Sequence, residues 1–277
     1  MESVGDDVPA VPDLQIRTTG WARRVLVSVL PPIAVFAALL AAWEIFIDVT
    51  DQPAYVIPHL SAIAQSMGDD RGVLLEASWI TAQEILVGLA IGVVVGLALA
   101  VLLAQSRIIG RAVYPLVIGS QAVPVIVIAP VFVIWFGFGM LPKVLVAALI
   151  TFFPIVINTI AGLNSIDRET ISLMRVLQAS RWTTFWKVRV PGSLPFVFAG
   201  LKNAAVIATI GAIVGEWVGA ERGLGPLMIA SNATFDASLT FAAIVYLALM
   251  AMALFVVVLV AERLVIPWYF LSRRAQS

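Results

Sequence analysis

Long apolar runs are the feature that most limits what this chain can fold into. A membrane-spanning helix needs roughly 20 mostly apolar residues, and six segments meet that requirement. They cover about Val25–Ile47, Trp79–Ala104, Val113–Phe136, Lys143–Leu163, Leu194–Trp217 and Thr240–Ile266. Backbone polar groups in hydrocarbon must be paired within the chain, which favours helices. The sequence therefore predicts an all-α membrane protein with about six transmembrane helices.

Composition supports lipid as the natural solvent. Only 12% of the 277 residues are charged and 61% are hydrophobic, whereas a soluble domain carries about 25% charged residues. The formal net charge of +0 argues against a nucleic-acid partner. The absence of cysteine excludes disulfides, Cys-ligated zinc and thiol catalysis. The single histidine, His59, follows a proline in a polar connection, so we expect a loop residue rather than a ligand.

Two segments carry features that could change their assignment. Arg23 and Arg24 precede the first run as in a signal peptide, but the run is too long and no convincing cleavage site follows it. The third run contains Pro115, Pro124 and Pro130. Proline is tolerated in a span when neighbouring helices satisfy the freed carbonyls. We therefore expect a retained first helix and a kinked third helix buried in the bundle.

Basic residues predict the orientation. Placing the six spans in order leaves Arg71, Lys143 and Arg222 on one side and all other Lys and Arg residues on the opposite side. Cytoplasmic connections are enriched in Lys and Arg. This predicts a multi-pass membrane protein with both termini in the cytoplasm.

The long cytoplasmic connection Asn164–Ser193 is rich in Arg and Trp. Apolar residues recur there every three to four positions, at Ile171, Met174 and Leu177. The spacing predicts an amphipathic helix over Thr170–Lys187, with Asp167 capping its start and Pro191 and Pro195 ending it before the fifth span. Such a helix could lie on lipid headgroups or dock a cytoplasmic partner.

This connection resembles the cytoplasmic signature loop of ABC importer permeases. That loop reads Glu-Ala-Ala, three residues, Gly, nine residues, Ile-x-Leu-Pro. Val188, Val190 and Pro191 stand where Ile, Leu and Pro belong. The front half departs from the pattern, because Ser172-Leu173-Met174 replaces Glu-Ala-Ala and Gln178 replaces the glycine.

Other stretches between about Tyr55 and Ser231 resemble the nitrate/sulfonate/taurine branch of this family. They are Pro124–Gly139, residues 152–167, and Glu216 with Gly223-Leu224-Gly225. They are most similar to permeases for thiamine-precursor pyrimidines and riboflavin. The resemblance implies a type I ABC importer permease fold with a cytoplasmic coupling helix. It also implies import of a small organic solute across the bacterial inner membrane, with a thiamine-precursor pyrimidine or riboflavin favoured and sulfonate, taurine or nitrate as alternatives.

The resemblance also implies partners. Two copies of a cytoplasmic ABC ATPase would hold ATP and Mg²⁺, an extracytoplasmic solute-binding protein would deliver the solute, and a second permease would complete the path, as a homodimer or a heterodimer. The sequence agrees that ATP is handled elsewhere, since no lysine follows a glycine and a phosphate-binding Gly-Lys-Ser/Thr loop is absent. We expect no enzyme activity and no cofactor in this chain.

Four parts follow from this reading of the sequence. They are a disordered cytoplasmic segment at 1–24, a first transmembrane helix at 25–47, a core permease domain at 75–266 with the coupling loop at 164–193, and a cytoplasmic tail at 267–277. The sequence does not indicate what residues 1–20 do.

Candidate site residues fall into three groups. The resemblance implies an ATPase-docking group made of Ile171, Met174, Arg175, Gln178, Ala179, Ser180, Arg181 and Trp182. Polar or aromatic residues inside spans are candidates for the translocation path, namely Glu84, Gln121, Trp135, Asn158, Asn203 and Thr209. Receptor-docking candidates just outside the fifth span are Glu216 and Glu221.

Each group has a structural alternative. Glu84 could pair with Lys202 if the fold brings them together, the two asparagines could bond helix to helix, and Trp135 could pack against apolar neighbours. Glu216 and Glu221 could lie in a solvated turn. Gly88, Gly92 and Gly96 form a small-residue stripe that predicts close approach of another helix.

Two other classes of protein compete with this interpretation. An ion-coupled secondary transporter would show repeated halves and ionisable groups near the midplane, and the sequence shows no convincing repeat. A membrane-embedded enzyme would need a nucleophile–base pair or a metal cluster, and nothing suitable stands out with one histidine and no cysteine.

Overall fold

The computed structural model describes residues 21–274, and every element in that range is helical. The chain divides into two compact units, Met1–Gln52 and Pro53–Ser277. The prediction of disorder at 1–24 lies outside the described residues at 1–20 and is wrong at 21–24, which begin a helix. The end of the predicted tail, 275–277, also lies outside them. The all-α class predicted from the sequence is confirmed.

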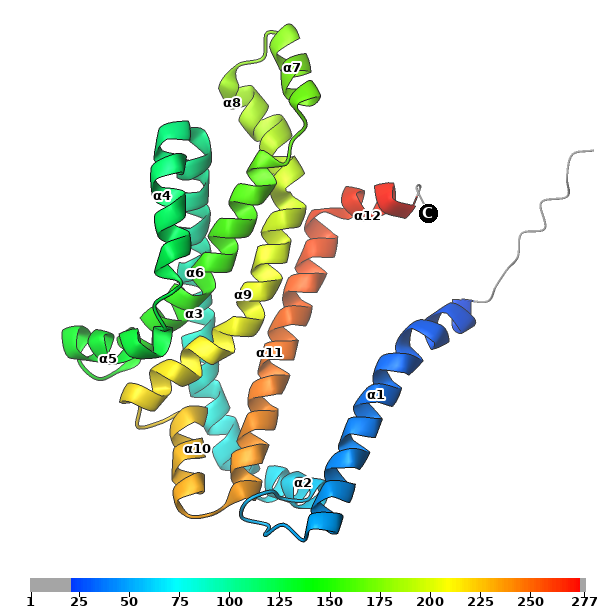
Figure 1. Cartoon of the computed structure of the whole chain (residues 1–277), viewed down its shortest axis with the longest axis vertical. Coiled ribbons are helices and arrows are strands. Elements are labelled where there is room, and N and C mark those ends of the chain that lie inside the picture. The colour runs from blue at the N-terminus through cyan, green and yellow to red at the C-terminus, as the bar shows by residue number, and fades with distance from the viewer. Residues whose placement is uncertain (1–20, 275–277) are drawn as a thin grey trace, which may run out of the picture. The chain divides into compact units, whose positions relative to one another are not determined.

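The first unit contributes a single described helix, α1 (Trp21–Thr50). The second unit contains a series of helices (Figure 1). These are α2 (Leu60–Asp69), α3 (Arg71–Gln105), α4 (Arg107–Ser120), α5 (Val125–Phe136), α6 (Met140–Asn164), α7 (Arg168–Val176), α8 (Arg181–Thr184), a π-helix (Phe185–Arg189), α9 (Val190–Gly219), α10 (Leu224–Ala233), α11 (Ala237–Val265) and α12 (Pro267–Arg274).

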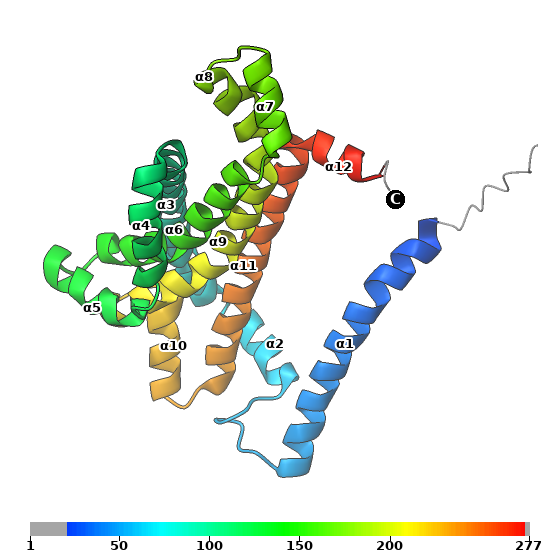
Figure 2. The ribbon, with the colours of Figure 1, turned by 45° about the horizontal axis from the view of Figure 1, so that its top comes forward.

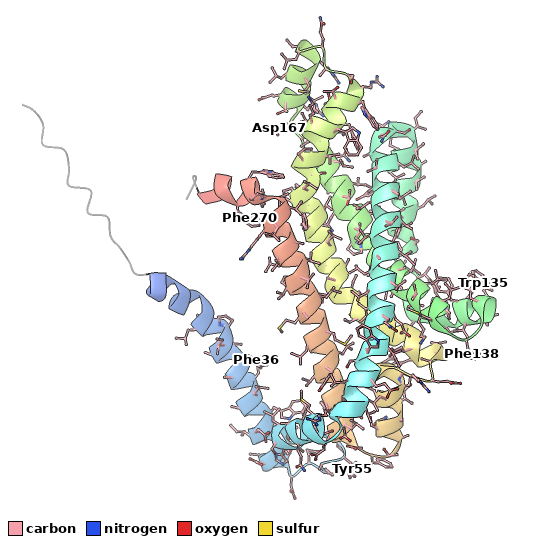
Figure 3. All side chains as sticks on the ribbon, turned by 180° about the vertical axis from the view of Figure 1, so that it is seen from behind. Phe36, Tyr55, Trp135, Phe138, Asp167 and Phe270 are labelled. Carbon is pink, nitrogen blue, oxygen red and sulfur yellow. The ribbon has the colours of Figure 1, made fainter. Side chains whose placement is uncertain are left out.

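Five of the described helices are long and apolar enough to cross a membrane, and α4 with α5 provides a sixth span if the pair counts as one. The prediction of about six spans is therefore confirmed. Apolar side chains remain exposed along most of α11, as they do along α1, where Phe36 is an example (Figure 3). Exposed apolar faces of this length are what lipid-facing helices present to hydrocarbon.

The third predicted span, Val113–Phe136, differs from the structure. It is two helices, α4 and α5, bent by 96° at the break between them. Tight i→i+3 hydrogen bonds close the break, including Val123 N–H to Ser120 O at 3.2 Å, and Pro124 follows without an N–H to continue the helix. The pair is also mostly exposed, so the prediction of a kinked helix buried in the bundle is wrong.

The centre of the second unit is α6, which packs against both α3 and α9 (Figures 1 and 2). Glycines allow this contact on each side. A Cβ at Gly92 of α3 would lie 3.0 Å from the backbone oxygen of Ala148, and a Cβ at Gly211 of α9 would lie 2.8 Å from Ala147 Cα. The predicted role of the Gly88, Gly92 and Gly96 stripe in close helix packing is confirmed.

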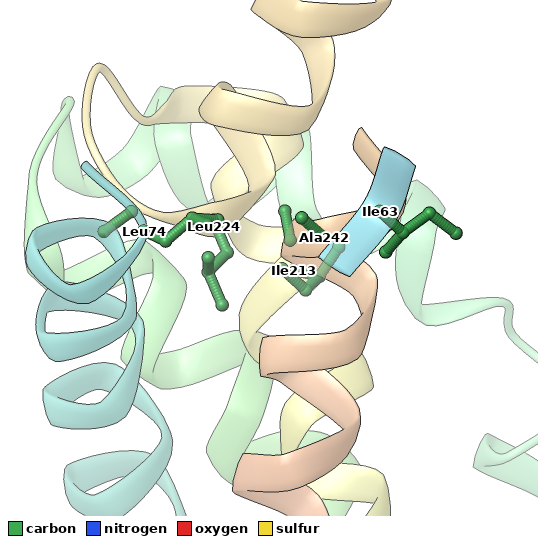
Figure 4. Packing of buried hydrophobic residues seen from close by; sticks show 7 residues of the cluster. Ile63, Leu74, Ile213, Leu224 and Ala242 are labelled. Carbon is green, nitrogen blue, oxygen red and sulfur yellow. The ribbon is translucent and has the colours of Figure 1, made fainter. Parts of the chain in front are cut away.

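The two ends of this bundle differ. The helical hairpin of α7 and α8 protrudes at one end, where α3 ends and α12 begins, and α10 lies at the opposite end with α2 (Figures 1 and 2). We call these the α7–α8 end and the α10 end. The α10 end holds an apolar cluster drawn from α2, α3, α9, α10 and α11 (Figure 4). Its buried members are Ile63, Leu74, Ala77, Ile213, Leu224, Ala242 and Ala243.

Replacing Gly92 with leucine is expected to destabilise the bundle by about 1–3 kcal/mol or more, because the new side chain must displace α6. Thermal unfolding of the detergent-purified protein measures the loss. Gly72→Leu on the same helix is the matched control, since nothing lies within 4 Å of a Cβ there. Equal melting temperatures for the two variants would contradict the packing role.

Candidate functional site

The α10 end contains buried charged groups that come from three candidate spans. Lys143 of α6 forms an ion pair with Glu84 of α3, and both side chains are buried. Glu216 of α9 is also buried and interacts electrostatically with both partners. A charge in a low-dielectric interior is costly unless it is paired, so Glu84 and Lys143 depend on each other for their place. This pair ties α3 to α6.

Glu216 also anchors the start of α10. Its Oε2 accepts a hydrogen bond from the backbone N–H of Gly225 at 2.6 Å, and its Oε1 accepts one from the Thr81 hydroxyl at 2.6 Å. Thr81 Oγ1 in turn accepts the backbone N–H of Leu224 at 2.9 Å. The first N–H groups of a helix lack partners within it and attract negative charge. A side chain from another helix therefore caps α10.

The glycines around Leu224 are explained by this cap. Gly223 has a φ of 127°, which is unfavourable for a residue with a Cβ. A Cβ at either Gly223 or Gly225 would run into the Glu216 side chain. The Gly223-Leu224-Gly225 pattern thus makes room for the carboxylate that holds α10.

Glu216 was placed by sequence reasoning just outside the fifth span, as a receptor-docking candidate. The structure corrects its position, because α9 continues to Gly219 and leaves Glu216 only 1% exposed. A side chain so buried offers no surface to a docking protein. Glu221 is exposed in the connection to α10, so that candidate keeps an accessible side chain.

A second ion pair joins the spans elsewhere in the bundle. Lys202 of α9 donates to Glu262 Oε2 of α11 at 2.8 Å. The sequence alternative in which Lys202 pairs with Glu84 does not occur, because Lys202 pairs with Glu262 and Glu84 pairs with Lys143. The sequence could not distinguish these pairings, because all four residues are separated from their partners by about 60 positions.

The remaining path candidates are not gathered at one point. Gln121 lines a groove beside the α4–α5 break, and Trp135 is exposed on α5, in ring contact with Phe132 and Phe136 (Figure 3). Asn203 is exposed on α9. The other two are satisfied within their own helices, Asn158 by donating to Pro154 O at 2.7 Å and the buried Thr209 by donating to Val206 O at 2.8 Å.

The predicted helix over Thr170–Lys187 is broken in the structure. Helix α7 ends at Val176, and a Schellman turn follows, in which Ala179 N–H bonds Met174 O and Gln178 N–H bonds Arg175 O, each at 2.9 Å. Gln178 has a φ of 55°, the left-handed conformation that glycine adopts at least cost. The glycine of the signature loop stands at this position, so the turn explains why that residue type suits it.

The second half of the loop continues directly into the fifth span. Ser180 caps α8 by accepting from Thr183 N–H at 3.0 Å, and the helix then runs unbroken from Arg181 to Gly219. The expected stop at Pro191 does not occur. A π-turn precedes it, with Val190 N–H bonded to Phe185 O, and this wider turn accommodates a residue that has no N–H and would otherwise crowd the preceding turn.

Exposure separates the predicted ATPase-docking residues into two sets. Ile171, Met174 and Ala179 are half-buried, and the structure exposes the others, Arg175, Gln178, Ser180, Arg181 and Trp182.

Asp167 occupies the N-cap position of α7, as predicted (Figure 3). Its side chain makes no capping hydrogen bond there.

Sequence reasoning did not identify three further exposed apolar residues of this hairpin as site residues. Leu173, Val176 and Leu177 are 57%, 79% and 66% exposed. Their three-to-four spacing was a usable signal, but the inward and outward faces of α7 could be told apart only with its neighbours in place.

An all-helical bundle with several membrane-length apolar helices, a buried ion pair and a protruding basic hairpin defines a multi-pass membrane protein. A family model described as "binding-protein-dependent transport system inner membrane component" matches residues 92–270. The chain belongs to this family and is a permease subunit of an ABC importer.

Relatives with assigned names confirm the predicted branch. The chain is 36% identical to the formylaminopyrimidine transport permease protein ThiX of Halalkalibacterium halodurans over 86% of its own length and 96% of the relative. It is 37% identical to the riboflavin transport system permease protein RibX of Chloroflexus aurantiacus, over 83% of its length and 87% of the relative. Identity to the taurine permease TauC of Escherichia coli is 25%, over 92% and 96%.

Solved structures confirm the fold. Two crystal forms of the MetNI methionine ABC transporter in inward-facing conformations match with TM-scores of 0.57 and 0.61. They cover 69% of this chain and 96% and 95% of the matched chains, at 21% and 20% identity. The type I ABC importer permease fold predicted from the sequence is thereby confirmed.

Replacing Glu216 with alanine is expected to destabilise the α10 end, because the Gly225 N–H and the Thr81 hydroxyl lose a buried partner. Each unsatisfied group costs about 1–3 kcal/mol. Limited proteolysis of the connection before α10, together with thermal unfolding in detergent, measures the effect. Glu221→Ala, at an exposed position five residues away, is the control, and equal protection of both variants would contradict the cap.

Replacing Gln178 with glycine is expected to slow local opening of the α7–α8 turn, by up to about 1 kcal/mol, since the left-handed conformation no longer strains a side chain. Hydrogen exchange of residues 168–184 measures the change. Gln178→Ala keeps a Cβ and should show no such gain. If alanine protected the turn as well as glycine does, the conformational explanation would fail.

Proposed function

We propose that two copies of this chain form the translocation unit of an importer that a cytoplasmic ABC ATPase drives and an extracytoplasmic solute-binding protein supplies. The observation that carries the proposal is the α7–α8 hairpin. It projects from the bundle with exposed apolar residues (Leu173, Val176 and Leu177) set among exposed arginines (Arg175 and Arg181). Exposed apolar side chains rimmed by polar ones mark protein interaction sites.

The hairpin end is the cytoplasmic end in this proposal. Family membership implies an ATP-driven system, and ATP is available on that side. The first part of α4, the α7–α8 hairpin with the π-helix that follows it, and α12 lie at this end (Figure 1) and carry most of the basic residues of the second unit. Cytoplasmic enrichment of Lys and Arg supports the orientation. Both chain termini would then be cytoplasmic.

ATP and Mg²⁺ are bound by the two ATPase subunits and not by this chain. Their closure on ATP would push two α7–α8 hairpins together. The opposite end, with exposed Glu221, would receive the solute-binding protein. Coupling of this kind requires an element with two conformational states, and both the ATPase and the solute-binding protein must shift the balance between them. The unbroken helix from Arg181 to Gly219 joins the two ends and is suited to that role.

The favoured solute is a thiamine-precursor pyrimidine or riboflavin. Identity of 36–37% to relatives named for formylaminopyrimidine and riboflavin supports it. Relatives named for aliphatic sulfonates, taurine and nitrate are 25–27% identical, so those solutes are the alternative for the same importer type.

The double variant Leu173→Glu with Val176→Glu is expected to weaken ATPase binding at least about tenfold. Burying a single such side chain is worth about 1.5–3 kcal/mol, and a factor of ten in affinity is about 1.4 kcal/mol. Co-purification of the co-expressed ATPase with tagged permease measures the loss.

Val56→Glu is the matched control, since Val56 is 48% exposed outside the hairpin, between α1 and α2. The control should retain the ATPase. Equal ATPase recovery for the double variant and the control would overturn the docking role of the hairpin. Uptake that persists without ATP but requires an ion gradient would overturn the importer mechanism.

A further inference from the structure

A groove of about 450 Å³ lies beside the break between α4 and α5. Its walls come from the break itself, from α5, from α6 and from α9. Binding sites for small molecules commonly measure about 300–1,000 Å³ and combine apolar walls with a few polar groups. Of the six path candidates proposed from the sequence, only Gln121 lines this groove.

The lining of the groove is apolar and uncharged. Ile128, Ile150, Phe153, Ile207 and Ile210 supply much of the wall. The polar side chains of the lining are those of Ser120 and Gln121, both exposed. No charged residue is among the described residues that line the groove. An ionic solute would lose hydration there without gaining a counter-charge, which is costly.

Amide side chains continue from the groove along the neighbouring helices. Asn203 is exposed on α9 and shares a helix face with Ile207 and Ile210, at the i, i+4 and i+7 positions. Asn158 lies one turn beyond Pro154 on α6, where its NH₂ group donates to the Pro154 carbonyl. Polar side chains within spans face a protein interior or a wet cavity, because exposing them to hydrocarbon is expensive. This argues against lipid chains as the occupant.

We propose that this groove binds a neutral, planar heteroaromatic solute during translocation, which rests on the proposed importer function and identifies the class of its cargo. Phe153 and the isoleucines offer an apolar surface to the ring faces. The Gln121 amide can both donate and accept at a ring edge that carries ring nitrogens and amino groups. Anions such as nitrate or a sulfonate find no cationic partner in the lining.

The test reconstitutes the permease with its ATPase and solute-binding protein in vesicles. ATP-driven uptake of formylaminopyrimidine, riboflavin, nitrate and an alkanesulfonate is measured, along with ATP hydrolysis. The wild type should take up at least one of the two neutral heteroaromatics and neither anion. Gln121→Leu should lower that uptake about three- to tenfold, as expected for one lost hydrogen bond, while receptor-stimulated ATP hydrolysis continues.

Gln83→Leu is the matched control, since Gln83 is an exposed glutamine of α3 that does not line the groove. Equal uptake by the two variants overturns the site. Uptake of an anion, or of none of the four solutes while ATP hydrolysis stays coupled to the receptor, overturns the solute class and leaves the importer function standing. Separation of the two permease copies by Gln121→Leu, but not by Gln83→Leu, would show that a second chain fills the groove.

Discussion

The contact of α6 with α3 on one side and α9 on the other is the interaction on which the rest of the structure depends. Lipid tails are as apolar as leucine, so spans gain little by hiding apolar side chains from them, and close backbone packing must hold them together. Gly88, Gly92 and Gly96 on one side and Gly211 and Gly215 on the other permit that approach. The positions of the polar groups follow from the helix separation that these glycines set.

Two sets of polar ties act within this packed frame. At the α10 end, the Glu84–Lys143 pair joins α3 to α6, and Glu216 of α9 bonds both Thr81 of α3 and Gly225 of α10. Lys202 and Glu262 join α9 to α11. Such pairs add specificity more than net stability, because desolvation offsets much of their attraction. They fix which helix faces meet, a choice that apolar contacts alone leave open.

Sequence patterns predicted the helices well because lipid leaves few alternatives to a long apolar helix. These patterns failed where the structure depends on the direction of the chain after a break, or on a side-chain partner that is distant in the sequence. Three prolines could not reveal a 96° bend, since the same pattern also fits a single span with a slight kink. The role of Glu216 depends on Thr81, 135 residues away, and on a turn that reverses the chain. The uncharged groove needed the packed bundle, because its walls come from separate helices.

The five-residue π-turn at Phe185–Arg189 has a mechanical consequence. An ordinary proline break at Pro191 would act as a joint and absorb a push on the hairpin. The π-turn instead keeps the 39 residues Arg181–Gly219 in one continuous helix, which bends along its length (Figure 1). Arg181 in the hairpin and Glu216 at the α10 end therefore belong to one continuous helix, and Glu216 in turn holds the first turn of α10.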